Sequence, residues 1–143
     1  MAELRRIWRG SYFNYVKGKF LEMVVQNIMS RFNNEEVDGK LFGHPGEVIT
    51  APLFKARGDM VVKLPTSGEY QVDAYGDYER NGTKYIWVAE CKYRKNEPMT
   101  SQEVTKALQA ASAVKEIRGA QEMKVWLVST GGFTEEALAL IRE

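Results

Sequence analysis

The amino-acid sequence predicts an α/β domain in which helices flank a mixed central sheet. Three patterns favour this class: an amphipathic helix over residues 11–32, a β-hairpin over residues 70–93, and a strand–helix–strand unit over residues 84–130. With a last helical segment, they give the order helix, two or three strands, helix, strand, helix. A length of 143 residues is typical of one domain, so we expect a single unit over residues 1–143 with one core.

Composition and charge narrow the function classes. The net charge is only +1, which disfavours a nonspecific polyanion-coating protein but permits a local basic groove. The single cysteine, Cys91, cannot form an intrachain disulfide and fits a reducing compartment. The sequence contains neither an apolar run of about 18 residues nor a signal-peptide pattern. We therefore expect a cytoplasmic protein with no membrane partner.

The chain begins with a basic, amphipathic segment, residues 1–11. This segment has two interpretations: a short helix packed on the core, or a basic arm near a phosphate backbone. The clearest helix follows, over residues 11–32. Its apolar residues recur at helical spacing: Phe13, Val16, Phe20, Leu21, Val24, Val25, Ile28 and Phe32. Glu22 lies at the flank of this stripe, where it faces either solvent or the edge of the core.

Residues 33–70 carry weaker signals. Glycine and proline favour a loop at the start of this region, and residues 48–56 and 60–65 have the composition of strands. Pro52 limits the first of these strands to a sheet edge or a bulge. We expect Arg57-Gly58-Asp59 to separate the two strands.

The dipeptide Asn-Gly at residues 81–82 indicates a two-residue hairpin turn, because it stands between two β-rich runs. The turn fixes the register of the hairpin. If the residues on either side of the turn pair with each other, Asp73 lies directly opposite Glu90, and Gln71 lies opposite Lys92. Side chains alternate along a strand. The second strand therefore has two faces, one with Ile86, Val88, Glu90 and Lys92 and the other with Trp87, Ala89, Cys91 and Tyr93.

The predicted pair of carboxylates raises a physical problem. Directly opposed residues in a sheet have Cβ atoms about 4.5–5.5 Å apart, so Asp73 and Glu90 repel each other, and burial adds to the cost of ionising them. One carboxyl could keep a proton, Lys92 could neutralise one charge, or a divalent cation could lie between the two acids. A solvated salt-bridge cluster is the ordinary alternative, but the apolar strand that carries these charges disfavours it.

The C-terminal third predicts the second half of the sheet and two helices. Residues 100–118 have a helical pattern that begins with a capping box from Thr100 to Glu103. Residues 124–130 are a short apolar run typical of a buried strand, and a last helix follows, capped by Thr134. The strand at residues 84–92 and the strand at residues 124–130 are expected to be parallel, because a helix joins them.

These residues resemble a known superfamily. Asp73, followed 17 residues later by Glu90-Cys91-Lys92, resembles the PD-(D/E)XK motif of the restriction-endonuclease-like nucleases. The segment GKFLEMVV resembles their first motif and aligns its glutamate with Glu22, and VSTGGFTEEA is similar to a segment of Mrr-type restriction endonucleases. Archaeal Holliday junction resolvases share this core. The sequence departs from the pattern at Val72, where the motif has proline, and at Glu90, where many Mrr-type proteins have glutamine.

The resemblance implies a restriction-endonuclease-like core in α-β-β-β-α-β-α order and a metal-dependent endonuclease that hydrolyses DNA. It implies that Asp73 and Glu90 bind Mg²⁺, or Mn²⁺ in its place, with help from Glu22 and the backbone carbonyl of Cys91. Lys92 would orient or deprotonate the attacking water. Homodimers are common in this superfamily, and a partner domain or chain is a further possibility.

The residues themselves leave other interpretations open. Arg94 and Lys95, just after the predicted catalytic strand, could hold DNA phosphates or belong to a solvated loop. Gln109 could face the site, although a polar surface position is the more common role. A catalytically inactive nuclease-fold module that binds nucleic acid or a partner protein is the main alternative function. An unrelated enzyme that uses Asp73 and Glu90 as a general acid/base pair is the third.

Overall fold

The computed structural model describes residues 11–64 and 68–142, so residues 1–10 of the predicted N-terminal arm lie outside the described residues. The elements follow in the order α2 (Ser11–Ser30), β1 (Glu35–Asp38), a 3-10 helix η1 (Gly39–Phe42), β2 (Val48–Ala51), β3 (Ala56–Leu64), β4 (Gly68–Arg80), β5 (Thr83–Lys92), α3 (Ser101–Arg118), β6 (Glu122–Ser129) and α4 (Glu135–Ile141). None of the described helices is long and apolar enough to cross a membrane.

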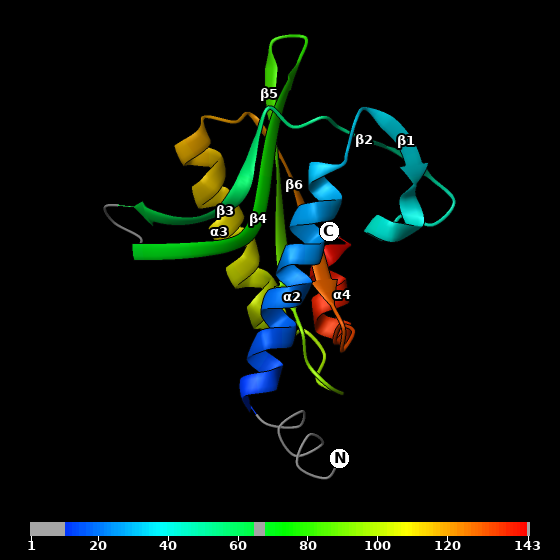
Figure 1. Ribbon diagram of the computed structural model, residues 1–143, viewed down its shortest axis with the longest axis vertical. Coiled ribbons are helices and arrows are strands. Elements are labelled where there is room, and N and C mark those ends of the chain that lie inside the picture. Colours follow the sequence, from blue (N-terminus) through cyan, green and yellow to red (C-terminus); the bar gives the residue numbers. More distant parts are fainter. Residues whose placement is uncertain (1–10, 65–67, 143) are drawn as a thin grey trace.

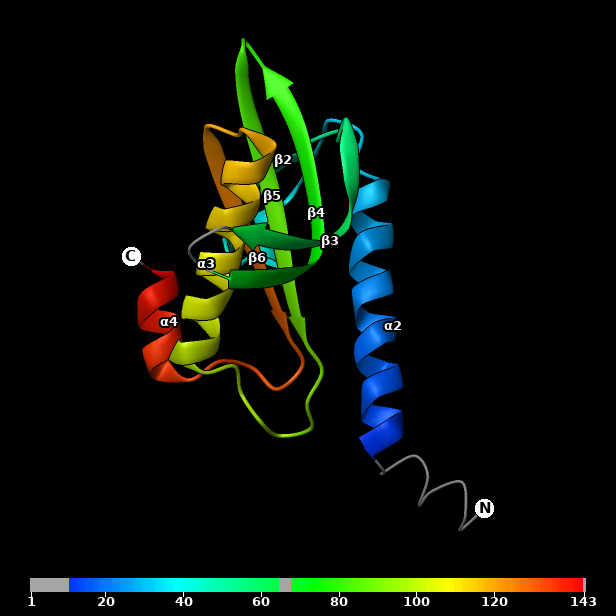
Figure 2. The same cartoon turned by 90° about the vertical axis from the view of Figure 1, so that its left-hand side faces the viewer.

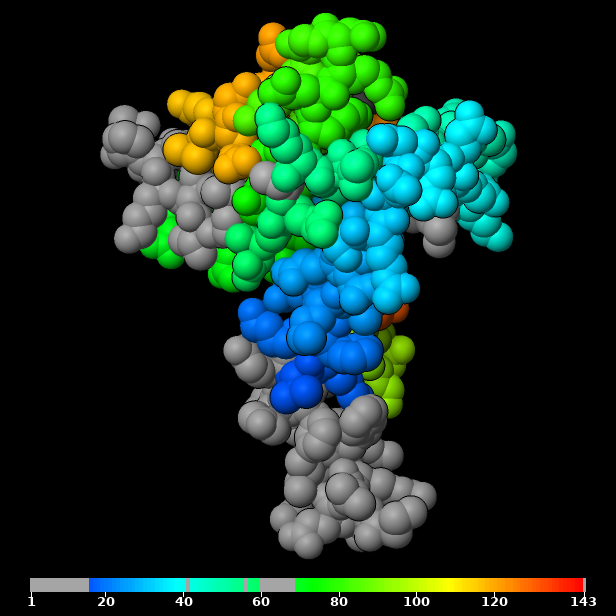
Figure 3. Space-filling view, turned by 45° about the horizontal axis from the view of Figure 1, so that its top comes forward, coloured from blue at the N-terminus to red at the C-terminus, as the bar shows by residue number. Residues whose placement is uncertain are grey.

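The main sheet has four strands in the order β3-β4-β5-β6 (Figure 1). β4 pairs antiparallel with both β3 and β5, and β6 is parallel to β5, as the helix between them requires. The predicted mixed sheet is therefore confirmed, and the main sheet with its helices has the predicted α-β-β-β-α-β-α order. β1 and β2 form a separate two-stranded sheet. In the space-filling view, the residues that include them (cyan) form a lobe at one side of the molecule (Figure 3).

Two predictions about strand limits are wrong. Residues 57–59 do not separate two strands, because they lie inside β3, and the register shifts between Gly58 and Met60. The shift marks a bulge, which lets one strand continue where the sequence suggests a break. The segment at residues 48–56 is also divided, because β2 ends at Ala51 just before Pro52 and pairs with β1, outside the main sheet.

Helices cover both faces of the sheet, with α2 on one side and α3 and α4 on the other (Figure 2). Trp87, Ala89 and Cys91 belong to the core cluster under α2. Ile86 and Val88 pack against α3 residues such as Ala111. The predicted alternation of faces along β5 is confirmed, and this strand is buried from both sides.

α2 buries a narrower stripe than its sequence suggests. Val25, Met29 and Phe32, at or just after its end, lie in the core, and Leu21 packs against them. The other apolar residues of the predicted stripe are exposed where the structure describes their side chains: Val16, Phe20, Val24 and Ile28. The helix meets the sheet along one line of contact, so residues 100° away from that line remain in solvent.

α3 begins and ends where the sequence predicts. Thr100 accepts a hydrogen bond from the backbone N–H of Glu103, and the Glu103 carboxylate accepts one from the backbone N–H of Thr100. Gly119 ends the helix in the left-handed conformation, with φ of 66°. This capping box fixes the first turn of α3 at the end of the molecule where β5 ends.

Candidate active site

The site is built where β4 separates from β5. The ladder between them runs from Arg80 and Thr83, on either side of the turn, to Ala74 and Ala89, in the predicted register. Beyond Ala74, β4 pairs with β3. The expected pairing of Asp73 with Glu90 and of Gln71 with Lys92 is therefore wrong as a ladder, because the two strands diverge just before these positions.

Asp73 lies at this junction and replaces the missing backbone pairing with side-chain bonds. Its Oδ2 accepts a hydrogen bond of 2.7 Å from the backbone N–H of Cys91. Its backbone carbonyl accepts one of 2.7 Å from Nε2 of Gln26 on α2. Both partners hold the Asp73 backbone and carboxyl in place, so the carboxyl points across the gap between the strands toward β5.

A cavity of about 690 Å³ opens at the junction. Its walls come from α2, β4, β5 and α3, and it brings together all four predicted catalytic residues, Glu22, Asp73, Glu90 and Lys92. Gln109 of α3 also lines the cavity and is exposed. It therefore both faces the site and occupies a polar surface position. Four segments far apart in the chain therefore meet at one polar cavity.

The carboxyls of Asp73 and Glu90 are costly to ionise together. Burial, and then the nearby charge of Glu90, raise the pKa of Asp73 to about 7, against the lowering effect of the Cys91 hydrogen bond. Glu22 raises it further through its charge and a side-chain hydrogen bond. Burial also raises the pKa of Glu90, although Lys92 and a hydrogen bond with Asp73 oppose the rise. The pair therefore favours one shared proton near neutral pH when nothing else is bound.

Lys92 and Lys19 each neutralise one acid at the rim of the cavity. Nζ of Lys92 lies 3.4 Å from Oε1 of Glu90, and Nζ of Lys19 lies 3.2 Å from Oε2 of Glu22. Both lysines remain partly exposed, so their ammonium groups are open to a ligand that enters the cavity.

The donor set fits a small hard cation better than a fully protein-bound metal. No group of three or more His, Cys, Asp or Glu side chains forms a ready-made metal site in residues 11–64 and 68–142. Mg²⁺ needs less, because it is often held by one or two carboxylates together with waters and substrate phosphate oxygens. Asp73 and Glu90 supply two carboxyls that repel each other beside an open cavity, which is the situation a divalent cation relieves.

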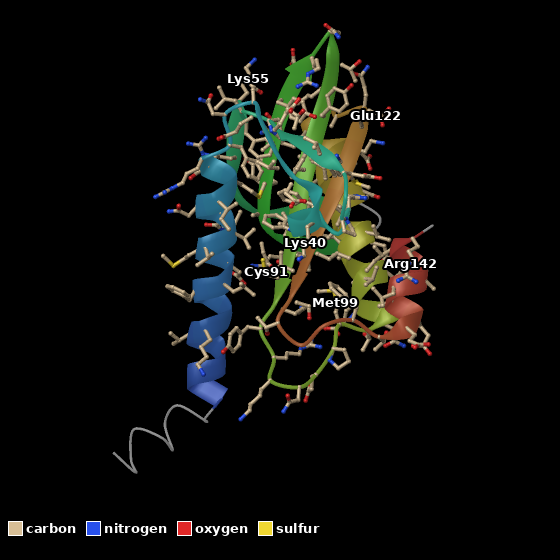
Figure 4. All side chains as sticks on the ribbon, turned by 90° about the vertical axis from the view of Figure 1, so that its right-hand side faces the viewer. Lys40, Lys55, Cys91, Met99, Glu122 and Arg142 are labelled. Atoms are coloured by element: carbon tan, nitrogen blue, oxygen red, sulfur yellow. The ribbon has the colours of Figure 1, made fainter. Side chains whose placement is uncertain are left out.

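Cys91 is held away from this chemistry. Its side chain is buried on the face of the sheet that α2 covers (Figure 4). Glu90 and Lys92 lie on the other face of β5, since side chains alternate along a strand. Burial raises the pKa of its thiol, so the sulfur is not a reactive nucleophile. Its backbone N–H donates to Asp73, and the nearby charges of Asp73 and Glu90 add to the rise in the thiol pKa.

The two predicted phosphate contacts differ in their surroundings. Arg94 forms a two-pronged ion pair with Glu103, and its backbone N–H donates to Oγ1 of Thr130. The ion pair with Arg94, together with the hydrogen bonds that the Glu103 carboxylate accepts from Thr100, lowers the pKa of Glu103 to about 2. Lys95 is exposed. Arg94 thus ties the end of β5 to the first turn of α3, so a phosphate could take it only by displacing Glu103.

Several residues of the site are not evident in the sequence. Gln26, Glu103 and Lys106 reach the junction or the cavity wall from helices. Helical spacing offers one signal, because Lys106 lies three residues after the capping-box acid Glu103 and so on the same side of α3. No comparable signal exists for Gln26, whose partner is a backbone carbonyl 47 residues away.

A family model described as a restriction endonuclease, Mrr_cat, matches residues 35–143, more than half of the chain. No curated protein and no solved structure matches the chain. The span matched by the family model contains Asp73, Glu90 and Lys92 but not Glu22, which lies upstream of it on α2.

Proposed function

Because the chain belongs to the restriction endonuclease family with an Mrr-type catalytic domain, and is thus a nuclease domain, we propose that it is a Mg²⁺-dependent endonuclease of DNA. The reaction is hydrolysis of a phosphodiester bond in the cavity between α2 and α3. We take residues 1–143 as one nuclease domain. The single, buried Cys91 supports a reducing, cytoplasmic setting.

One observation carries the proposal: a buried carboxyl, Asp73, and a partly buried one, Glu90, lie where two strands diverge and face one open cavity beside a lysine. Such a pair is costly in the empty protein, since burial and mutual repulsion disfavour its charged form. The stability of the fold does not require two such acids side by side. A site that binds a cation and a phosphate does require them, because both negative charges then take part in binding.

Asp73 and Glu90 would hold the cation, with Glu22 and the backbone carbonyl of Cys91 beside them. Bound there, Mg²⁺ would supply positive charge for the phosphate oxygens and lower the pKa of a coordinated water. Mn²⁺, with similar ligand preferences, is expected to substitute.

The side chains of the protein would orient the water, position the acids and contact the phosphates. Nζ of Lys92, 3.4 Å from Glu90, orients the attacking water and, as an ammonium, stabilises the negative charge that develops on the phosphate. To take up the proton of the water, it would first have to lose its own proton to solvent. Gln26 and the Cys91 N–H fix the position of Asp73, so the acids need little rearrangement when substrate arrives. Lys95, exposed after β5, holds a neighbouring phosphate, and Arg94 joins it when it leaves Glu103.

Plasmid cleavage with Mg²⁺ or Mn²⁺ tests the proposal. Wild type is expected to cut, and Asp73→Ala, Glu90→Ala and Lys92→Ala are each expected to lower the rate at least about 100-fold, since each removes a charge that acts on the reacting phosphate. Glu79→Ala, an exposed acid of β4 that does not line the cavity, serves as the control. Cutting that survives all three substitutions would show that the active residues are misassigned.

The raised pKa of Asp73 beside Glu90 also favours a second candidate, a general acid/base enzyme that needs no metal. The two functions separate in EDTA. The nuclease loses its activity when the chelator is present and regains it with added Mg²⁺, whereas an acid/base pair works equally well in both conditions.

A further inference from the structure

A DNA strand that enters the cavity meets several carboxyl groups. Five carboxyls and three lysines line it, and Arg94 pairs with one of the five, Glu103. Two of these lysines face an acid at close range, Lys19 against Glu22 and Lys92 against Glu90. Lys106 differs, because it forms no ion pair or hydrogen bond with any of the residues that the structure describes.

Lys106 stands on the α3 wall, as does Glu103, while the other four acids stand on the strands and on α2. The side of α3 that lines the cavity repeats at helical spacing through Glu103, Lys106, Ala107 and Ala110. The two alanines are small and buried, so they add no bulk between Lys106 and the opening. An exposed lysine at that place can reach a group that enters the cavity without first losing a partner.

The wall itself is held firmly. The capping box at Thr100 fixes the first turn of α3, and the ion pair of Arg94 with Glu103 ties that turn to the end of β5. Lys106 lies in the next turn, three residues further on. The position of its Cα is therefore fixed relative to Glu90 and Lys92, and only its side chain has to move.

We propose that Lys106 is a positioning residue that binds a backbone phosphate of the DNA strand on the α3 side of the cavity. This inference rests on the proposed function and assigns the substrate contact on the wall opposite Asp73. Lys92 cannot serve both purposes, because its ammonium is placed 3.4 Å from Glu90, at the reacting centre. A compact ammonium suits one phosphate oxygen as a point charge, and the contact is independent of base sequence.

Cleavage kinetics and binding together test the proposal. Cleavage of a fluorescent oligonucleotide duplex with Mg²⁺ gives KM and kcat, and anisotropy with Ca²⁺ gives Kd between about 50 and 200 mM KCl. Lys106→Ala is expected to raise KM and Kd roughly fivefold with kcat within about twofold, the effect of one lost charge-assisted contact. The slope of log Kd against log salt should become shallower by about 0.9. Lys106→Arg, which keeps the charge, should stay close to wild type.

Lys40→Ala is the matched control, because Lys40 is an exposed lysine of η1 that does not line the cavity and its loss changes the net charge equally (Figure 4). It should leave KM, Kd and the salt slope unchanged.

If wild type cuts DNA and Lys106→Ala has the KM and slope of wild type, the phosphate contact is wrong while the nuclease stands. A fall in kcat alone, or an equal effect of Lys40→Ala, also overturns the contact. If wild type binds DNA in the Lys106-dependent way but does not cut, the contact stands and the nuclease fails; if it neither binds nor cuts, both fail.

Discussion

At the scale of single residues, Asp73 joins a structural role and a proposed functional one. Its carboxyl replaces the strand partner that the Cys91 N–H loses when β4 leaves β5, at 2.7 Å. The same carboxyl faces the cavity with a pKa raised to about 7 by burial and by Glu90. The end of the ladder therefore creates the site, because only a side chain freed from regular pairing can satisfy the backbone and still face a ligand.

The ion pair of Arg94 with Glu103 gives a prediction on pH. Its hydrogen bonds lower the pKa of Glu103 to about 2, from a usual 4.5, so the ionised form stabilises the fold. That contribution is present above about pH 4.5 and is lost as the pH falls toward 2. Glu103→Gln should lower the free energy of unfolding by about 1–2 kcal/mol at pH 7, with a smaller difference at pH 3.5.

Urea unfolding at both pH values measures this difference. Glu116→Gln, an exposed acid further along α3, is the control and should change the free energy of unfolding by less than about 0.5 kcal/mol. Equal stabilities of Glu103→Gln and wild type at pH 7 would mean that the pair contributes nothing and that the first turn of α3 is held by packing alone.

Residue types and strand alternation were sufficient to predict the face that carries Glu90 and Lys92, because period-two patterning depends only on local sequence. They were not sufficient for the end of the ladder at Ala74, since that depends on where β4 leaves β5 while it continues along β3. Gln26 was missed for a related reason: a side-chain bond to a distant backbone carbonyl leaves no periodic trace.

At the scale of elements, α2 shows how a correct helix prediction can misjudge burial. The apolar pattern covers a wide arc, but the sheet contacts only the stripe of Leu21, Val25 and Met29. The hydrophobic period therefore established that residues 11–30 form a helix, while the extent of its contact came from the shape of the sheet. Glu22 and Gln26, at the margin of the stripe, reach the cavity or the junction because that contact is narrow.

Two methionines of α2 test this arrangement with one residue type. Met29 is 2% exposed and Met23 is 64% exposed. Met29→Ala should cost about 2–4 kcal/mol of unfolding free energy, because it leaves a cavity in the core. Met23→Ala should change it by less than about 0.5 kcal/mol, since the side chain is already in water. Chemical denaturation of both variants measures the difference, and equal losses would contradict the placement of α2 on the sheet.

At the scale of the whole molecule, the sheet carries two helix layers that hold opposite walls of one cavity. α2 supplies Glu22 on one side and α3 supplies Lys106 on the other, while β4 and β5 supply the acids between them. No single element contains the site, so the fold must be complete before a cation and a phosphate can bind. Ligand binding and folding stability should therefore be coupled.

That coupling predicts that the acids proposed to bind the cation destabilise the folded protein when the cation is absent. At pH 8, above the pKa of about 7 that burial and Glu90 give Asp73, the Asp73 carboxyl is ionised beside Glu90, which destabilises the protein in EDTA. Mg²⁺ at about 100 times its Kd should stabilise it by about 2.7 kcal/mol, an increase in Tm of several degrees. Asp73→Asn keeps an oxygen acceptor for the Cys91 N–H but removes the repulsion. Its Tm in EDTA should exceed that of wild type, and its response to Mg²⁺ should vanish.

Thermal unfolding of both proteins, with and without Mg²⁺, measures the four values. If Mg²⁺ raised both Tm values equally, the cation would bind elsewhere. If Asp73→Asn melted below wild type in EDTA, the two acids would not oppose each other in the folded protein.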